Sequence, residues 1–357
     1  MKRTAGWSRF ALAFLMGCLL MCGSGAFAAN AGVGGVRCDN PTFANAKPAP
    51  AGSVAVVLSH GWTGSTSGMH DLADSLRNEL KGVSVYLFDY GRDSDRWPSD
   101  PRIAACLGAF IHNISDQNSV PVVYAAHSMG GLAIRFAADP KYAGSAAVTT
   151  KQLAEVVTID TPHLGSPWGG TKPAQVLQVV QMLTTHGGLP GQGRAADKCL
   201  SETRPCDLPP YLPAGTSMHM VSGETSIKRT AFGVELYRIP MRGDGIVLDG
   251  SMSGYLTSGP LGVTRPVGRV GFTTASCLDD SGAMTTALSK LTPPVPAPIV
   301  SHWVRAFTDM SAWDDINDGK LTLGSGTLWG VATLTAKCSH LSIMDQPETR
   351  ATIIAAV

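Results

Sequence analysis

A single serine lies where a valine-rich apolar run meets a second apolar run of different periodicity. Residues 120–126 predict a buried strand and residues 132–138 predict a buried helix. The turn between them reads Ala-His-Ser-Met-Gly-Gly, and Ser128 stands between the small residues Ala126 and Gly130. Small residues at these positions let the strand and the helix cross at a tight, strained turn. We therefore expect the Ser128 hydroxyl to project above a sheet, at the helix N-terminus that favours negative charge.

The remaining apolar segments predict alternating strands and helices. Such alternation indicates a mostly parallel sheet with helices on both faces, which is an α/β fold. The predicted strands lie at 54–58, 83–88, 120–126, 155–160, 218–223 and 328–336, the last of these being the final strand, and two crossover helices lie at 68–81 and 100–114, with proline at a favourable first-turn position in the second.

The turn around Ser128 resembles the nucleophile elbow of secreted bacterial lipases and carboxylesterases, in the variant with alanine in place of the first glycine. A serine between small residues also occurs in ordinary turns, but the strand before it and the helix after it favour the elbow. The resemblance implies the α/β-hydrolase fold with a cap insertion, and it implies that Ser128 is the nucleophile. An oxyanion hole, an acid and a histidine should then follow from the rest of the chain.

The predicted strand 54–58 leads directly into Ser-His-Gly-Trp-Thr-Gly at 59–64, which resembles the oxyanion-hole loop of lipases. On that resemblance, the backbone N–H groups of Trp62 and Met129 are the two donors to the oxyanion. His60, Gly61 and His127 are assigned to the surroundings of the substrate. A plain glycine turn after a strand is the alternative for the loop.

A second histidine follows the strand after the elbow. The segment Thr-Pro-His-Leu-Gly-Ser at 161–166 resembles one that lipases carry in this place. The fold requires the order serine, acid, histidine, so His163 comes too early to be the base. We predict that His163 is a loop residue near the substrate pocket.

The acid and the base are expected nearer the C-terminus. Gly-Asp-Gly-Ile-Val at 243–247 resembles the lipase segment that holds the acid, which implies Asp244, with Asp249 as the alternative. The predicted strand 328–336 leads into Lys-Cys-Ser-His-Leu-Ser, which looks like the lipase histidine loop and implies that His340 is the general base.

No cofactor and no metal are predicted. Some lipases hold calcium with an aspartate two residues after the catalytic histidine, but Ser342 stands there in this chain, and Asp345 is the alternative ligand. The sequence contains no Cys-x-x-Cys or Cys-x-x-His spacing of the kind that binds zinc.

Residues 1–28 have the form of a secretory signal, with a basic start, an apolar run at 10–21 and an Ala-x-Ala site at 26–28. A lipoprotein signal ending at Cys18 is the alternative. Cleavage would leave 357 − 28 = 329 residues, and the product would be secreted or periplasmic.

We expect an exposed lead-in at 29–52 and an α/β-hydrolase domain at 53–357. Its predicted insertions are a cap at 168–216, where 173–184 would be a lid helix or a core helix, and a segment at 252–324.

Six cysteines would remain after cleavage, and an even number in an exported chain indicates disulfides. Close spacing favours Cys199–Cys206, and Cys277–Cys338 would tie down the segment just before His340. The six cysteines are Cys38, Cys106, Cys199, Cys206, Cys277 and Cys338.

The mature charge of 25 basic against 27 acidic residues excludes the basic footprint of a nucleic-acid-binding protein.

These features predict a secreted serine ester hydrolase, a lipase or carboxylesterase, that acts through a Ser-His-Asp triad and an acyl-enzyme. The expected partner is an ester or lipid substrate, and transient contact with lipid surfaces is a further expectation. The oligomeric state is left open. An amidase or an acyltransferase on the same fold is the alternative, followed by a non-catalytic binding protein that kept the fold.

Overall fold

The computed structural model describes Cys38 and residues 54–187, 189–190, 195–203, 206–231, 234–254, 269–277, 331–334, 338–340 and 342–357. The predicted signal peptide, nearly all of the lead-in and most of the predicted second insertion lie outside these residues. The predictions made for them therefore stay predictions.

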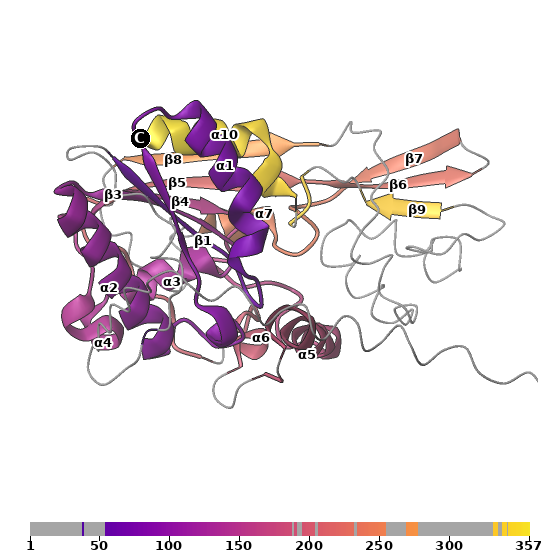
Figure 1. Ribbon diagram of the computed structural model, residues 1–357. Helices are drawn as coiled ribbons and strands as arrows, with labels where there is room; N and C mark the ends of the chain where they lie inside the picture. Colours follow the sequence, from indigo (N-terminus) through magenta and orange to yellow (C-terminus); the bar gives the residue numbers. More distant parts are fainter. Residues whose placement is uncertain are drawn as a thin grey trace, which may run out of the picture. The chain divides into compact units, whose positions relative to one another are not determined.

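A six-stranded sheet organises the described domain, and all of its neighbouring strands are parallel (Figure 1). The strand order is β2-β1-β3-β4-β5-β8, so the order reverses between β1 and β3. In open parallel sheets, ligands bind beyond the carboxyl ends of the strands at such a reversal. The strands are β1 (Ala55–Ser59), β2 (Ser84–Phe88), β3 (Val122–His127), β4 (Leu153–Ile159), β5 (Ser217–Glu224) and β8 (Val270–Ser276).

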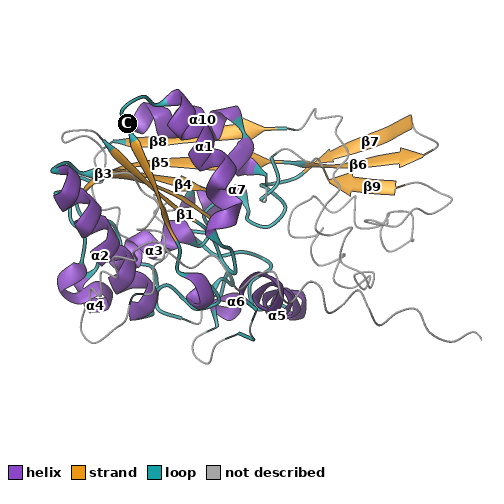
Figure 2. Ribbon diagram, in the orientation of Figure 1, coloured by secondary structure: helices purple, strands orange, loops and turns teal. Residues whose placement is uncertain are grey.

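Helices cover both faces of this sheet, as the alternation of strands and helices predicted (Figure 2). α2 (Pro101–Asn118) and α3 (Gly130–Ala137) pack on the face that receives Ala55 and Val57 of β1. α1 (His70–Glu79) and α10 (Pro347–Ala356) pack on the opposite face, with Val56 and Leu58. Burial of both faces explains why the strands are continuous apolar runs. The α/β-hydrolase fold predicted from the sequence is confirmed.

Short elements connect these layers. α2 begins as predicted, with Pro101 in its first turn and the Asp100 carboxylate accepting the Arg102 N–H at 3.0 Å. The remaining helices among the described residues are α4 (Pro140–Ala143), α5 (Lys172–His186), α6 (Ala196–Cys199) and α7 (Asp249–Met252). The 3₁₀ segments described there are η2 (Thr66–Met69), η3 (Gly91–Asp93), η4 (Gly144–Ala146) and η6 (Ile343–Asp345).

The predicted final strand is present, but it belongs to a second sheet. The predicted final strand at 328–336 contributes β9 (Val331–Leu334), which does not join the main sheet. β9 pairs antiparallel with β6 (Ser226–Ala231), which also pairs with β7 (Val234–Pro240). The last strand of the main sheet is β8, from within the range predicted as the second insertion. β8 is an edge strand on which mainly Ala275 is buried, so it lacks the apolar run of the central strands.

Three disulfides join all six cysteines that remain after the predicted signal peptide. Cys199–Cys206 and Cys277–Cys338 form as predicted. Cys38 bonds to Cys106 of α2, which ties the predicted lead-in to the domain.

In the described part of the chain, no helix is both long enough and apolar enough to cross a membrane.

Candidate active site

The turn after β3 has the geometry of a nucleophile elbow. Ser128 has a φ of 54°, an uncommon backbone conformation for a residue with a side chain. Hydrogen bonds hold it there, since its N–H donates to the Ile159 carbonyl at 2.8 Å and the Thr161 hydroxyl donates to its carbonyl at 3.0 Å. A Cβ added at Gly130 would lie 2.5 Å from the His60 carbonyl oxygen. Glycine is therefore required where the helix leaves the turn.

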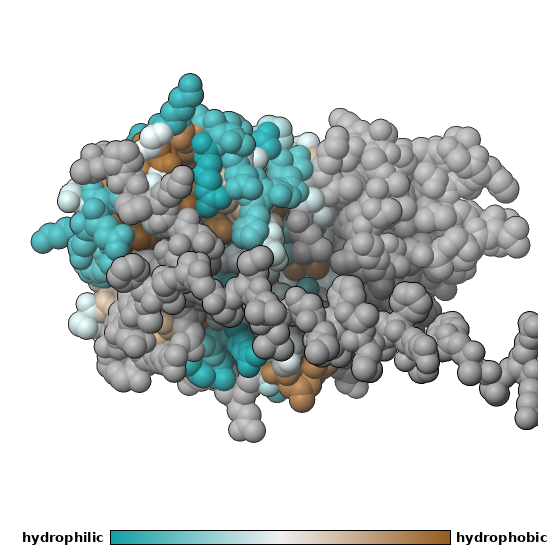
Figure 3. Space-filling model, in the orientation of Figure 1, coloured by the Kyte–Doolittle hydropathy of each residue, from teal (hydrophilic) through white to brown (hydrophobic). Residues whose placement is uncertain are grey.

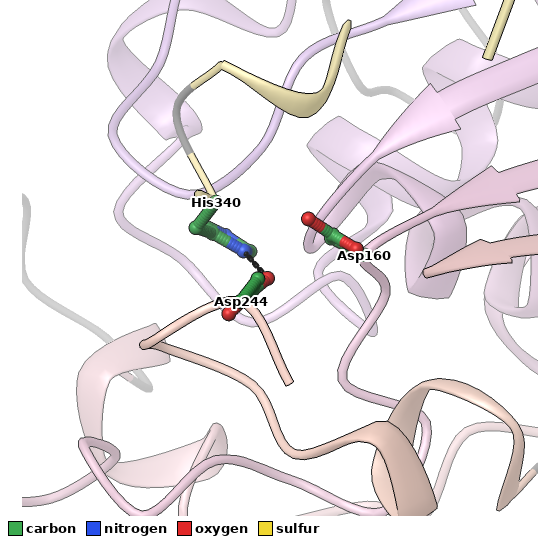
Figure 4. A group of neighbouring side chains, drawn as sticks. All are labelled: Asp160, Asp244 and His340. Carbon is green, nitrogen blue, oxygen red and sulfur yellow. Dashed lines mark hydrogen bonds and ion pairs between the residues drawn. The ribbon is translucent and has the colours of Figure 1, made fainter. Parts of the chain in front are cut away.

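The structure brings Ser128, His340 and Asp244 into one hydrogen-bonded chain. The Ser128 Oγ lies 2.9 Å from Nε2 of His340, and Nδ1 of His340 lies 2.5 Å from Oδ2 of Asp244. All three residues are at least nine-tenths buried. Figure 4 shows the His340 ring pointing at the Asp244 carboxylate. The serine, histidine and acid selected from the sequence thus meet at the carboxyl edge of the sheet.

Asp244 lies in the loop after β7, where the backbone fixes its carboxylate. Its Oδ1 accepts the N–H groups of Ile246 and Val247, both at 2.7 Å. Burial alone would raise the pKa of Asp244, but the charge and hydrogen bond of His340 and the other donors hold it below its usual value. The alternative acid, Asp249, is exposed at the start of α7 and accepts the Gly250 N–H instead.

His340 lies in the short loop before η6, and three connections hold that loop. The disulfide from Cys338 joins it to Cys277 at the end of β8. The His340 N–H donates to the Asp244 carbonyl at 3.2 Å, and Nε2 of His127 donates to the His340 carbonyl at 2.7 Å. Burial lowers the pKa of His127 to about 3, so the ring is neutral at pH 7. The structure thus places His127 as a support for His340.

The loop after β1 lies directly against the serine. A Cβ at Gly61 would lie 2.7 Å from the Ser128 Cβ, and the Gly64 N–H closes the turn on the Gly61 carbonyl at 3.1 Å. Trp62 follows Gly61 in this turn, and Met129 is the N-cap of α3. The first amides of a helix have no partner within the helix, so they can donate to a ligand. Both predicted oxyanion donors therefore belong to segments that adjoin Ser128.

The His60 side chain stabilises this loop through hydrogen bonds to Gly61 and Asp89. Its Nδ1 donates to the Gly61 carbonyl at 2.9 Å, and its Nε2 pairs with Oδ1 of Asp89 at 2.9 Å. Tyr90 stacks on the ring at 4.2 Å between centroids and donates its hydroxyl to the His60 carbonyl. Although burial raises the pKa of Asp89, its hydrogen bond and charge interaction with His60 bring the pKa to about 2. Asp89 and Tyr90 were not predicted; their position just after β2, beside β1, was the available signal.

His163 is placed in the core between α3 and the end of β4. Its Nδ1 lies 3.3 Å from an Arg135 guanidinium nitrogen, and its Nε2 lies 3.3 Å from the Thr158 hydroxyl. The ring is 1% exposed. This environment ties α3 to β4, and contact of His163 with substrate stays a prediction.

α5, within the predicted cap, contacts the loop after β1 through polar side chains. The Trp62 Nε1–H donates to Gln178, the Thr63 hydroxyl donates to Gln181, and Nε2 of His186 donates to the Gly64 carbonyl at 3.0 Å. These two glutamines were not predicted from the sequence. Leu183 of the same helix is 48% exposed.

Asp160, which the sequence analysis did not select, lies beside the acid and the base. One carboxylate oxygen of Asp160, one of Asp244 and one ring nitrogen of His340 all lie within 4.8 Å of one another. Among the described residues, this is the one group of three or more acidic, histidine or cysteine side chains that is close enough to hold a metal ion. Asp244 and His340 already bond to each other there, so the arrangement suits a hydrogen-bonded network better than a cation. The alternative calcium ligand Asp345 ends η6, and the Ser342 hydroxyl before it pairs with Ser339.

Comparison with known proteins adds a family match. Residues 52–195, less than half of the chain, match the model of the family described as "Putative serine esterase (DUF676)". The matched range contains Ser128 and the loop after β1 but neither Asp244 nor His340. No curated protein sequence matches the chain significantly. The match supports a serine hydrolase.

The solved structures that match this chain share little sequence with it. The mature Bacillus licheniformis lipase BlEst2 is 18% identical, with a TM-score of 0.38 over 64% of this chain and 86% of that chain. A Paleococcus ferrophilus monoacylglycerol lipase is 14% identical, with a TM-score of 0.36 over 65% and 89%. The RedJ thioesterase of Streptomyces coelicolor is 15% identical, with a TM-score of 0.38 over 64% and 83%. Likenesses this distant support no statement about activity.

Proposed function

We propose that the protein is a serine hydrolase of carboxylic esters, a lipase or carboxylesterase. The observation that carries this proposal is the hydrogen-bonded chain from Ser128 through His340 to Asp244, with Ser128 on an elbow. The family match over residues 52–195 supports the same conclusion, and it does not depend on these hydrogen bonds.

The proposed reaction has two steps. In the first, Nε2 of His340 takes the proton from the Ser128 hydroxyl as Oγ attacks the ester carbonyl. The tetrahedral oxyanion accepts hydrogen bonds from the N–H groups of Trp62 and Met129, and His340 then gives its proton to the departing alcohol. In the second, water loses a proton to His340 and attacks the acyl-enzyme, which releases the carboxylic acid and regenerates Ser128.

Contact with a lipid surface is part of the proposal. Three apolar side chains on or just after α5 are exposed: Val179 at 38%, Leu183 at 48% and Leu189 at 71%. In the space-filling view, hydrophobic residues gather beside the position of α5 (Figure 3). Exposed apolar groups beside a cap helix that bonds to the oxyanion loop suit a substrate with a long acyl chain.

Export is also part of the proposal. Three disulfides pair the six cysteines that follow the predicted signal peptide, and disulfides persist in oxidising compartments. A secreted or periplasmic location follows from this pairing and from the sequence of residues 1–28.

The test is hydrolysis of p-nitrophenyl esters with short to long acyl chains. We expect the purified protein to cleave them, and we expect Ser128→Ala to lose about 10³-fold or more in kcat. Ser145→Ala, at an exposed serine of η4, is the matched control and should keep full activity. Equal rates for the wild type and Ser128→Ala would refute the proposal. Turnover of amides or transfer to alcohols, but not ester hydrolysis, would favour the amidase or the acyltransferase.

A further inference from the structure

We propose that Asp160 is a neutral carboxylic acid that donates a hydrogen bond to Asp244 and thereby positions the acid of the triad. Asp160 is then a fourth member of the network, acting through Asp244 rather than on the substrate. This inference rests on the proposed function, because it assigns Asp160 a part in the same site.

The backbone conformation directly after β4 directs the Asp160 side chain toward Asp244 and His340. Its φ is 48°, and its N–H donates to the Val221 carbonyl of β5 at 2.9 Å. Its Oδ1 accepts the Gly223 N–H at 2.7 Å, so one edge of the carboxyl group is fixed against β5. Figure 4 shows the Asp160 carboxyl group beside Asp244 and His340.

The second oxygen of Asp160 is the unusual atom. Asp160 is fully buried, and in the described part of the chain its Oδ2 receives no donor. A buried carboxylate oxygen without a donor is costly, whereas a protonated carboxyl group becomes a donor that needs an acceptor. The titratable groups that face Asp160 from the described elements are Asp244, after β7, and His340, before η6. Asp244 is the acceptor within reach.

The donors around the two carboxyl groups decide which one carries the charge. Among the described residues, Asp244 accepts two backbone N–H groups and the Nδ1–H of His340, whereas Asp160 accepts the Gly223 N–H alone. Two buried carboxyl groups this close cannot both be ionised. Burial and the neighbouring charge of Asp244 raise the pKa of Asp160 well above its ordinary value. The proton therefore belongs to Asp160 and the charge to Asp244.

A hydrogen bond donated by neutral Asp160 to Asp244 affects the base, His340. The added hydrogen bond spreads the charge of the carboxylate and fixes its orientation toward His340. Without it, Asp244 would attract the proton of the imidazolium more strongly. His340 would then stay protonated to higher pH, and the acid limb of the pH–rate profile would move upward.

Two substitutions separate the donor from the side chain. Asp160→Asn keeps an N–H donor for Asp244 and an oxygen for Gly223, and asparagine tolerates a positive φ. Asp160→Gly removes the carboxyl group without a backbone penalty. Asp249→Asn, at an exposed aspartate with no place in the network, is the matched control.

The first measurement is kcat and KM for a p-nitrophenyl ester as a function of pH. We expect Asp160→Asn to keep at least about a tenth of the wild-type kcat, with its acid limb in the wild-type place. We expect Asp160→Gly to lose about ten- to a hundred-fold in kcat, with its acid limb at higher pH. KM should change little in either variant, because Asp160 does not touch the substrate.

The second measurement needs no substrate and therefore separates this inference from the proposed function. The downfield proton resonance of the His340–Asp244 hydrogen bond is followed by NMR against pH in all four proteins. Its titration should move in Asp160→Gly and stay in place in Asp160→Asn and Asp249→Asn. An unmoved titration in Asp160→Gly overturns the proposal even where kcat falls. Loss of activity in Asp160→Asn as deep as in Asp244→Asn also overturns it, because Asp160 would then be the ionised acid.

Discussion

The nucleophile half of the site and its acid–base half are held in place by different means. Ser128 and its supporting glycine belong to one continuous segment between β3 and α3, at the reversal of strand order. Asp244 and His340 come from loops 96 residues apart in the sequence, and a disulfide, backbone hydrogen bonds and His127 bring the two loops together. The first half depends on local steric fit, and the second depends on ties between distant segments. Substitutions should therefore affect the two halves differently.

The largest effect is expected from removing the charge of the acid. Asp244→Asn keeps the shape of the side chain but leaves Nδ1 of His340 without an ionised acceptor, so the ring can adopt the wrong tautomer. We expect kcat to fall by about 10⁴-fold with little change in the midpoint of thermal unfolding. Asp249→Asn should keep full activity, and a larger loss there than in Asp244→Asn would exchange the roles of the two aspartates.

Steric crowding should break the nucleophile half. In Gly61→Ala, the new methyl group would lie 2.7 Å from the Ser128 Cβ and push the loop away from the serine. We expect kcat to fall by about 10²–10³-fold, comparable to the loss of one oxyanion donor. The control is Gly68→Ala in η2, where an added Cβ meets nothing within 4 Å. Equal activities of the two variants would show that the loop does not need its present contact with Ser128.

Removal of one disulfide should weaken the acid–base half selectively. The double variant Cys277→Ser with Cys338→Ser frees the His340 loop from β8, which should lower kcat by about tenfold or more. The unfolding free energy should fall by about 2–4 kcal/mol, the usual contribution of a disulfide. Cys199→Ser with Cys206→Ser releases only a short loop near α6. A larger loss of kcat in this second pair would place the sensitive tie in the cap instead.

The smallest effect on activity is expected from the support that His127 gives, and this support appears mainly in the pH dependence of stability. The pKa of His127 in the folded protein is about 3, below the unfolded value near 6.5, so the unfolded chain binds the proton more readily. The contribution of this group to stability is therefore complete above about pH 6.5 and is lost as the pH falls toward 3, by at most about 1.4 kcal/mol per pH unit.

His127→Gln keeps an N–H donor for the His340 carbonyl but cannot titrate. Denaturant unfolding of both proteins, measured at several pH values between about 4 and about 8, checks the expectation. The stability of the variant should fall less steeply with decreasing pH than that of the wild type. Parallel curves would mean that the His127 ring is protonated without cost in the folded state.

Sequence patterns predicted the elements whose contacts are local. The run from β3 through Ser128 into α3 contains its own strand, turn and helix, and the central strands are apolar enough to be recognised alone. The short spacing of Cys199 and Cys206 predicted their bond in the same way. β8 was missed because an edge strand exposes alternate residues and has no apolar run.

Tertiary structure decided the rest of the site. Asp89 supports His60 because the parallel strands β1 and β2 bring their carboxyl ends to one edge of the sheet. Asp160 faces Asp244 because the loop after β7 brings Asp244 to the same edge. No spacing along the chain reveals either contact. Gln178 and Gln181 of α5 bond to Trp62 and Thr63 because the helix packs against the loop after β1. The sequence by itself determined the strained serine turn and the sheet that carries it, because steric fit and burial act on neighbouring residues. Which carboxyl groups share the proton beside His340 was decided by the folded structure alone, because electrostatic coupling depends on distance in space.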